Sequence, residues 1–209
     1  VDVQNTAFQG TFSLCMSEAV DYDYYEGAED ITGLINSCSA DAAYTTLGAT
    51  GDQNAGSCWN TTVQYNRWFK FTAPASGTIT ATVDRGGSKG TVRRVQMAIW
   101  DTDGSTELAC NQYVGDNDVV KATALGLTPG NTYYISVDNN YSGYRGTFTL
   151  CLSDAADYDY YEGAEDITGL INSCSTDAAY TTIGATGDQN AGSCWNTTAQ
   201  YNRWFKFTA

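Results

Sequence analysis

Apolar and polar residues alternate with a period of two along several segments of the chain. The clearest are residues 67–71, 79–83, 95–99, 133–137 and 148–152. Successive side chains of a β-strand point to opposite faces of a sheet, so this alternation is typical of strands with one buried face. The pattern predicts a chain built of β-strands. A single stretch, residues 28–34, has a sequence suited to a short helical turn.

Turn-forming residues separate the predicted strands. The turn sequence Pro74–Gly77 precedes the strand beginning at Thr78, and Leu127–Asn131 precedes the strand beginning at Thr132. Proline presets the backbone of a turn, and glycine supplies conformations that other residues avoid. Short strands punctuated in this way predict an all-β fold, and we expect a β-sandwich.

The chain repeats itself at a spacing of 136 residues. Residues 10–73 and residues 146–209 differ at only seven of 64 positions. We therefore expect the last strand of one repeat in residues 1–16, a complete β-sandwich repeat in residues 17–153, and the first part of a further repeat in residues 154–209. The sequence is interpreted as a window on a longer tandem array. Near-identical copies favour a function that comes from repetition, as in a stalk, an adhesin or a filament.

Four of the seven cysteines fall in the complete repeat. An even number predicts two disulfides per repeat and a location in an oxidising compartment outside the cytoplasm. Four cysteines allow three pairings. The pairing that we expect joins Cys38 with Cys58, Cys110 with Cys151, and Cys174 with Cys194. Metal binding by the cysteines is disfavoured, because the chain has neither a CxxC pair nor a histidine.

Acidic residues outnumber basic ones by 24 to 10, which gives a formal net charge of −14. Such a chain repels nucleic acid and anionic membrane surfaces. We therefore expect cations, neutral glycans or other proteins as partners. The sequence has no apolar run of the roughly 20 residues that a membrane-spanning helix needs, so membrane insertion is not expected.

Two acidic segments are candidate calcium sites, because carboxylate oxygens are ligands that calcium prefers. The first is residues 21–30, repeated at residues 157–166, where a solvated acidic linker is the alternative. The second combines two loops that also suit ordinary hairpin turns. The candidate ligands are Asp21, Asp23 and Glu26 in the first site, and Asp101, Asp103, Asp116 and Asp118 in the second. Calcium is thus a candidate ligand, and no cofactor is expected to be required.

Several aromatic residues offer flat faces for sugar rings or for the side chains of a partner. They are Trp59, Trp68, Trp100, Tyr24, Tyr25, Tyr113, Tyr141 and Tyr144, of which Trp68 and Trp100 are more readily explained as core residues. The tyrosines of the acidic segments are expected to form contacts between successive domains or between neighbouring chains. These interface candidates are Tyr22, Tyr24 and Tyr25, with their copies Tyr158, Tyr160 and Tyr161.

Five motifs occur in the same order as in a known domain. They lie at residues 68–78, 97–101, 108–111, 127–135 and 146–151. Together they resemble the bacterial pre-peptidase C-terminal domain, in the cysteine-bearing form of large secreted and cell-surface proteins of Bacteroidetes. The resemblance covers almost a whole repeat. It implies a jelly-roll-like β-sandwich in a secreted protein, used as a non-catalytic accessory or repeated module and in some cases binding calcium.

Catalysis is not expected. Without histidine the chain has no Ser-His-Asp or Cys-His arrangement, and it has no glycine-rich phosphate loop. We expect a structural extracellular protein that associates with itself through adjacent repeats and neighbouring chains. The alternatives are an adhesin whose repeats bind glycans, and a passive spacer or accessory domain of a larger secreted enzyme.

Overall fold

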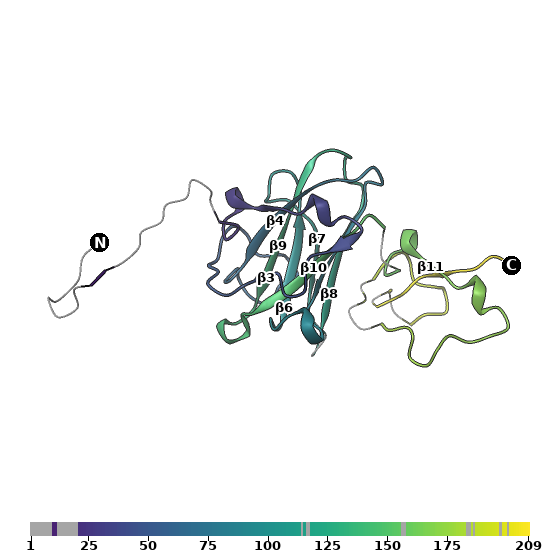
Figure 1. Cartoon of the computed structure of the whole chain (residues 1–209). Helices are drawn as coiled ribbons and strands as arrows, with labels where there is room; N and C mark the ends of the chain where they lie inside the picture. The colour runs from purple at the N-terminus through teal and green to yellow at the C-terminus, as the bar shows by residue number, and fades with distance from the viewer. Residues whose placement is uncertain are drawn as a thin grey trace.

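The computed structural model describes residues 10–11, 21–113, 115, 118–155, 158–182, 185, 187–196, 198–199 and 201–209. Strands and short 3-10 turns make up its regular structure, so the predicted all-β class is confirmed. Residues 21–155 form two β-sheets packed face to face (Figure 1). The expected strand in residues 1–16 lies almost entirely outside the described residues.

The larger sheet has five strands in the order β1-β4-β9-β6-β7. Its strands are β1 (Glu29–Asp30), β4 (Arg67–Thr72), β9 (Thr132–Asn139), β6 (Val95–Trp100) and β7 (Glu107–Gln112). The pairs β4–β9, β9–β6 and β6–β7 are antiparallel, whereas the short β1 pairs with β4 in parallel. The predicted strands at residues 67–71, 95–99 and 133–137 therefore lie side by side.

The smaller sheet has four strands in the order β3-β10-β5-β8. Its strands are β3 (Tyr44–Thr45), β10 (Thr147–Ser153), β5 (Ile79–Asp84) and β8 (Val119–Ala124), and the short β2 (Ser37–Cys38) lies beside β10. The 3-10 turns of this part are η2 (Tyr25–Gly27), η3 (Thr32–Leu34), η4 (Gly87–Lys89) and η5 (Ser142–Tyr144). The helical turn expected within residues 28–34 corresponds to η3.

The core lies between the two sheets and contains the apolar residues that produced the period-two pattern. Phe69, Ile99 and Ile135 of the larger sheet face Val83 and Leu150 of the smaller sheet, and all five are fully buried. Alternate residues of each strand point to the core, as the sequence pattern requires. The alternation along the chain thus places the strands in a sandwich.

The outer face of the larger sheet is also covered. Trp68, Ala98 and Trp100 point away from the core, yet they form a second buried cluster with Trp59 and Ala28. The cover consists mainly of residues 46–66, a long segment without strand or helix that we call the covering segment. All six residues of β6 are buried for this reason, since both faces of this strand are shielded from water.

Residues 158–209 begin to build the same fold again. Strand β11 (Glu165–Asp166) pairs in parallel with β12 (Phe205–Lys206), with the partner positions that β1 has on β4. The turns η6 (Tyr161–Gly163) and η7 (Thr168–Leu170) correspond to η2 and η3. The repeat in the sequence is therefore also a repeat of local structure.

Candidate functional site

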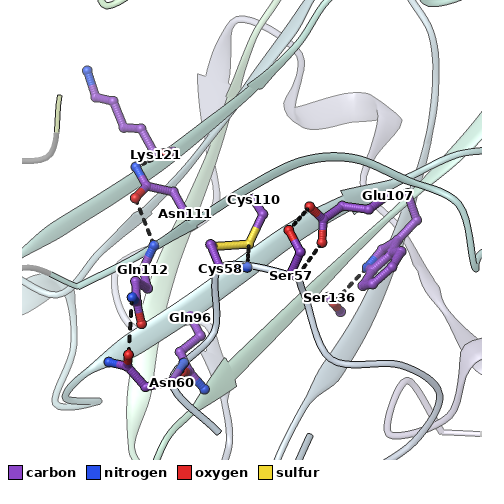
Figure 2. Close-up of a disulfide and its surroundings, with 11 residues drawn as sticks. Ser57, Cys58, Asn60, Gln96, Glu107, Cys110, Asn111, Gln112, Lys121 and Ser136 are labelled. Carbon is purple, nitrogen blue, oxygen red and sulfur yellow. Dashed lines mark hydrogen bonds between the residues drawn. A yellow bond between two sulfur atoms is a disulfide. The ribbon is translucent and has the colours of Figure 1, made fainter. Parts of the chain in front are cut away.

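The covering segment is fastened to the outer face of the five-stranded sheet by a disulfide and by polar contacts. Cys58 is joined to Cys110 of β7, and Figure 2 shows this bond together with its surroundings. Beside it, the Ser57 hydroxyl donates to the Glu107 carboxylate at 2.6 Å. The backbone N–H of Asn60 donates to the side-chain oxygen of Gln96 at 2.9 Å. The outer face therefore holds a long irregular segment in a defined position.

The disulfide pairing predicted from the sequence is wrong. Cys38 is bonded to Cys151 rather than to Cys58, and Cys58 is bonded to Cys110. The physical reason is that the covering segment carries Cys58 across the larger sheet to β7, while β2 places Cys38 beside β10 of the smaller sheet. Cys110 and Cys151 lie in different sheets, so each bonds to the cysteine beside its own sheet and not to the other.

The expected bond between Cys174 and Cys194 is also absent, since both are free and exposed in the described structure. They are the counterparts of Cys38 and Cys58, which bond to Cys151 and Cys110 rather than to each other.

The first acidic segment is tied into its own domain by Arg67. The Arg67 guanidinium lies 3.2 Å from the Asp23 carboxylate and 3.6 Å from that of Asp21. Asp23 also accepts hydrogen bonds from the backbone N–H and the hydroxyl of Thr50, both at 2.9 Å. Glu26 remains exposed. Asp23 is therefore a buried structural partner of Arg67, whereas Asp21 forms a longer ion pair and stays exposed to solvent.

The second candidate calcium site is divided between separate local structures. The Asp103 carboxylate caps its own turn by accepting from the backbone N–H groups of Ser105 and Thr106, which hold its pKa well below the usual range. Asp118 instead forms an ion pair with Arg85 at 3.0 Å.

The other two candidate ligands are Asp101 and Asp116. The carboxylate of Asp101 accepts from the backbone N–H of Thr102, and Asp116 lies outside the described residues. Within the described part of the chain, no three acidic, cysteine or histidine side chains lie close enough to hold a metal ion. Calcium binding stays a prediction.

The tyrosines of the first acidic segment divide into two groups. Tyr22 packs against Tyr44 and Phe69, and Tyr25 packs against Trp68 and Tyr134. Both residues thus have aromatic contacts within one domain, and their predicted contacts between domains or chains stay a prediction. Tyr24 is 45% exposed, and its interface role stays a prediction.

The copies of these tyrosines have similar neighbours in residues 158–209. Tyr158 contacts Tyr180 and Phe205, as Tyr22 contacts Tyr44 and Phe69. Tyr161 contacts Trp204 and is 57% exposed, and Tyr160 is half-buried. Tyr161 therefore has more of its ring available than Tyr25, because the strands that cover Tyr25 have no counterpart around Tyr161.

Most tryptophans proposed as sugar-binding faces are internal. Trp59, Trp68 and Trp100 are all buried in the cluster under the covering segment. In contrast, Tyr141 is 61% exposed and packs edge-on against the half-buried Tyr144. The aromatic surface of the sandwich is thus tyrosine rather than tryptophan.

Arg93 and Arg94 lie over the ring of Tyr144, while Arg145 follows Tyr144 in the chain and lies over the ring of Tyr65. Sequence analysis did not single out these arginines. They belong to a surface that we call the Arg–Tyr patch, made of Arg93, Arg94, Tyr113, Tyr141, Tyr144 and Arg145. The patch forms where β6 begins and β7 and β9 end, because antiparallel pairing brings these strand ends together. The segment before β10 joins them through the hydrogen bond from the backbone N–H of Arg93 to the carbonyl of Tyr144. The sequence feature that could have indicated the patch is the occurrence of several arginines in tyrosine-rich loops of an otherwise acidic chain.

No protein-family model matches the chain, and no curated protein matches it in sequence. The resemblance to the pre-peptidase C-terminal domain therefore stays a prediction that rests on the five motifs. Any functional conclusion has to come from the chain's own geometry.

Proposed function

We propose that this chain is a structural extracellular repeat protein, in which tandem disulfide-bonded β-sandwich domains form an elongated fibre or filament. The proposal includes the absence of catalysis. Repeat arrays of this kind obtain their shape from identical contacts between neighbouring domains. Disulfides form and persist in oxidising compartments, so the bonds Cys38–Cys151 and Cys58–Cys110 support an extracellular location. Within the described residues, no helix is long and apolar enough to cross a membrane.

The observation that carries the proposal is that one sequence occurs in two states of burial. Residues 21–73 and 157–209 differ only at Ala40/Thr176, Leu47/Ile183 and Val63/Ala199. Nevertheless, the same apolar positions are covered in the first copy and open in the second. The exposed fractions rise from 0% at Phe69 to 38% at Phe205, from 0% at Phe71 to 66% at Phe207, and from 8% at Trp59 to 51% at Trp195.

This difference supports the proposal that residues 158–209 are the first part of a further sandwich. In the first copy, β4 pairs with β9 over six residues, and strands β5 to β10 cover its apolar side. The chain's own β9 is already occupied by β4, so it is not available to β12. An exposed apolar surface of this kind is costly in water. The second copy therefore needs another segment of the β5–β10 type, as a tandem array supplies.

The proposal is tested by lengthening the chain with a second copy of residues 74–153 after Ala209. If the repeats are tandem domains, Cys174 will bond to the added copy of Cys151, and Cys194 to the added copy of Cys110. Peptide mapping of the disulfides by mass spectrometry shows this directly. A bond between Cys174 and Cys194 in the lengthened chain would contradict the tandem-domain proposal.

Electron microscopy tests the filament itself. Negative-stain images of the lengthened chain, or of longer tandem constructions, should show rods whose length grows by a constant increment with each added repeat. Particles connected by flexible linkers without a fixed spacing would instead favour a spacer. The two measurements separate the folding of the repeats from their assembly.

A further inference from the structure

The Arg–Tyr patch is the main concentration of positive charge on the first sandwich. It holds three of the ten basic residues of a chain that carries 24 acidic ones. Arg93 and Arg94 are exposed, and Arg145 is half-buried. Among the described residues, Arg94 and Arg145 form no ion pair, whereas Arg67, Arg85 and Lys89 are each paired with a carboxylate.

The arginines of the patch are held in place by aromatic rings. The Arg94 guanidinium lies 4.9 Å from the ring centre of Tyr144 and 5.5 Å from that of Tyr113. The Arg145 guanidinium lies 5.0 Å from the ring of Tyr65, and its Nε donates to the carbonyl of Ser142. Stacking on a ring uses the face of a guanidinium and not its edges, so Arg94 can bind a carboxylate through two parallel hydrogen bonds.

The loop around the patch is also ordered by polar contacts. The hydroxyl of Tyr113 accepts from the side-chain amide of Asn140 at 3.0 Å, and the backbone N–H of Arg93 donates to the carbonyl of Tyr144 at 2.9 Å. Arg94 has a backbone φ of 51°, a conformation that is unfavourable for residues other than glycine. The fold therefore holds Arg94 in a strained position between two tyrosines, which fixes its guanidinium before any partner arrives.

The chain also offers exposed carboxylates of the matching kind. Glu26 and Glu29 lie beside the exposed Tyr24 at the β1 edge of the five-stranded sheet, and they form no ion pair among the described residues. In the second copy Glu162 and Glu165 are also exposed, and the exposed tyrosine next to Glu162 is Tyr161, because Tyr160, the counterpart of Tyr24, is half-buried. We call these two regions the acidic edges.

We propose that the Arg–Tyr patch docks onto an acidic edge of a second copy of this chain, with the arginines facing Glu26 and Glu29 or their counterparts. This inference rests on the proposed function and names the surfaces through which repeats of neighbouring chains meet. The two surfaces are different parts of the molecule, since one lies at the strand ends and the other along the β1 edge. A contact between unlike surfaces leaves one of each free, so it extends into an open filament rather than closing into a dimer.

Charge complementarity outweighs the net repulsion between two acidic chains under physiological conditions. Charges farther apart than about 8 Å are screened at about 0.15 M salt, so the local pairs dominate. A peptide carboxylate of a second copy is favoured over an anionic polysaccharide because the chain itself supplies two acidic edges that carry an exposed tyrosine next to the glutamates.

The test uses the whole chain with its free thiols alkylated, examined by analytical ultracentrifugation. The wild type should associate at about 0.15 M NaCl, and about 1 M NaCl should dissociate it. Arg94→Glu should weaken association by about tenfold or more, since a close charge pair contributes on that scale. The matched control is Lys121→Glu, which makes the same charge change at an exposed position of β8.

A complementation experiment identifies the partner surface. The Arg94→Glu chain and the Glu29→Lys/Glu165→Lys chain should each stay monomeric, whereas a mixture of the two should associate because one supplies an intact patch and the other intact acidic edges. A wild type that stays monomeric, or an Arg94→Glu chain that associates as the wild type does, would overturn the docking proposal. Arg94-dependent binding of polygalacturonate by a chain that does not self-associate would also overturn it, in favour of an anionic glycan.

The outcome is distinguishable from failure of the tandem-domain proposal. Disulfide mapping of the lengthened chain reports whether the repeats fold in tandem, and it does not depend on Arg94. Correct disulfides together with a monomeric chain would refute only the docking of the Arg–Tyr patch.

Discussion

The disulfide between Cys58 and Cys110 joins the middle of the covering segment to β7 of the five-stranded sheet. Its surroundings leave no room for a larger neighbour. A Cβ atom at Gly56 would lie 2.6 Å from Nε1 of Trp59 and 2.9 Å from Sγ of Cys110. The bond therefore lies in a closely packed site that fixes Trp59 over the outer face of the sheet, and the position of the covering segment depends on it.

Removing this bond should destabilise the sandwich. The Cys58→Ala/Cys110→Ala variant frees a loop of about 50 residues in the unfolded chain, and the expected loss is about 3–4 kcal/mol in the free energy of unfolding. Guanidinium unfolding followed by near-ultraviolet circular dichroism measures it. The Cys174→Ala/Cys194→Ala variant is the control, because these cysteines are unbonded. Equal losses in both variants would show that the bond itself contributes nothing.

Arg67 should be more important for stability than its counterpart Arg203. Arg67 is buried, and it donates to the carbonyls of Thr45 and Leu47 in addition to its ion pair with Asp23. Arg67→Ala leaves the buried Asp23 carboxylate without a cation, and removal of one partner from such a pair costs about 3–5 kcal/mol.

The control for Arg67 exists within the same chain. Arg203 forms the equivalent ion pair with Asp159 at 3.2 Å, but it lies outside the complete sandwich. Arg203→Ala should leave the unfolding of residues 21–155 unchanged in the same chemical denaturation experiment. Arg67→Lys should be intermediate, because lysine keeps the charge but loses the planar donor arrangement that reaches both carbonyls. A neutral Arg67→Ala variant would contradict the structural role of this ion pair.

Strands whose two faces differ in polarity were predictable from the sequence. The alternating segments at residues 79–83 and 148–152 form the paired strands β5 and β10, because their apolar side chains are buried in the same core. The pattern does not determine which strands are neighbours, because pairing is decided by contacts between residues far apart in the chain. The edge strands β1, β2 and β3 have two residues each, too few for any periodicity to be visible.

The outer face of the larger sheet was not predictable in this way. Gln96 and Asp138 occupy the polar positions of alternating strands, which predicts exposure, yet both are fully buried. They are buried because their side chains accept hydrogen bonds from the backbone of the covering segment, at Asn60 and at Gln64. The wrong cysteine pairing has the same origin, since a polar segment with no strand pattern gave no indication that it crosses the sheet.

Substitution of Gly104 should destabilise the sandwich, both because a side chain has no space there and because the backbone conformation favours glycine. Its φ is +65°, and a Cβ atom there would collide with the ring of Tyr25. Gly104→Ala should lower the free energy of unfolding by about 2 kcal/mol or more, because overpacking adds to the conformational strain. Gly87→Ala is the matched control, since Gly87 has a φ of +58° and open space around it. The Gly87→Ala variant should lose about 1 kcal/mol in the free energy of unfolding, from backbone strain alone. Equal melting temperatures for the Gly104→Ala and Gly87→Ala variants would contradict the packing argument.

Asp138 should give the sandwich an unusual dependence on pH. Its carboxylate accepts from the backbone N–H groups of Gln64 and Tyr65 at 2.9 and 3.0 Å, and it is fully buried. Burial raises the pKa of Asp138 from 3.8 to about 6, against the opposing effect of these N–H groups. A folded-state pKa above the unfolded value means that the contribution to stability is present below about pH 4 and is lost as the pH rises to about 6.

The Asp138→Asn variant isolates this titration. Asparagine keeps one acceptor oxygen but turns an N–H group toward the backbone donors, so the variant should be less stable by about 1–3 kcal/mol at pH 4. Because wild-type stability falls by about 2 kcal/mol between pH 4 and pH 6.5 through this residue, the difference between the two proteins should shrink or reverse over that range. Parallel urea unfolding at several pH values measures the difference. A constant gap would show that Asp138 titrates alike in the folded and unfolded chains, and a gap that widens with pH would mean that its hydrogen bonds outweigh its burial.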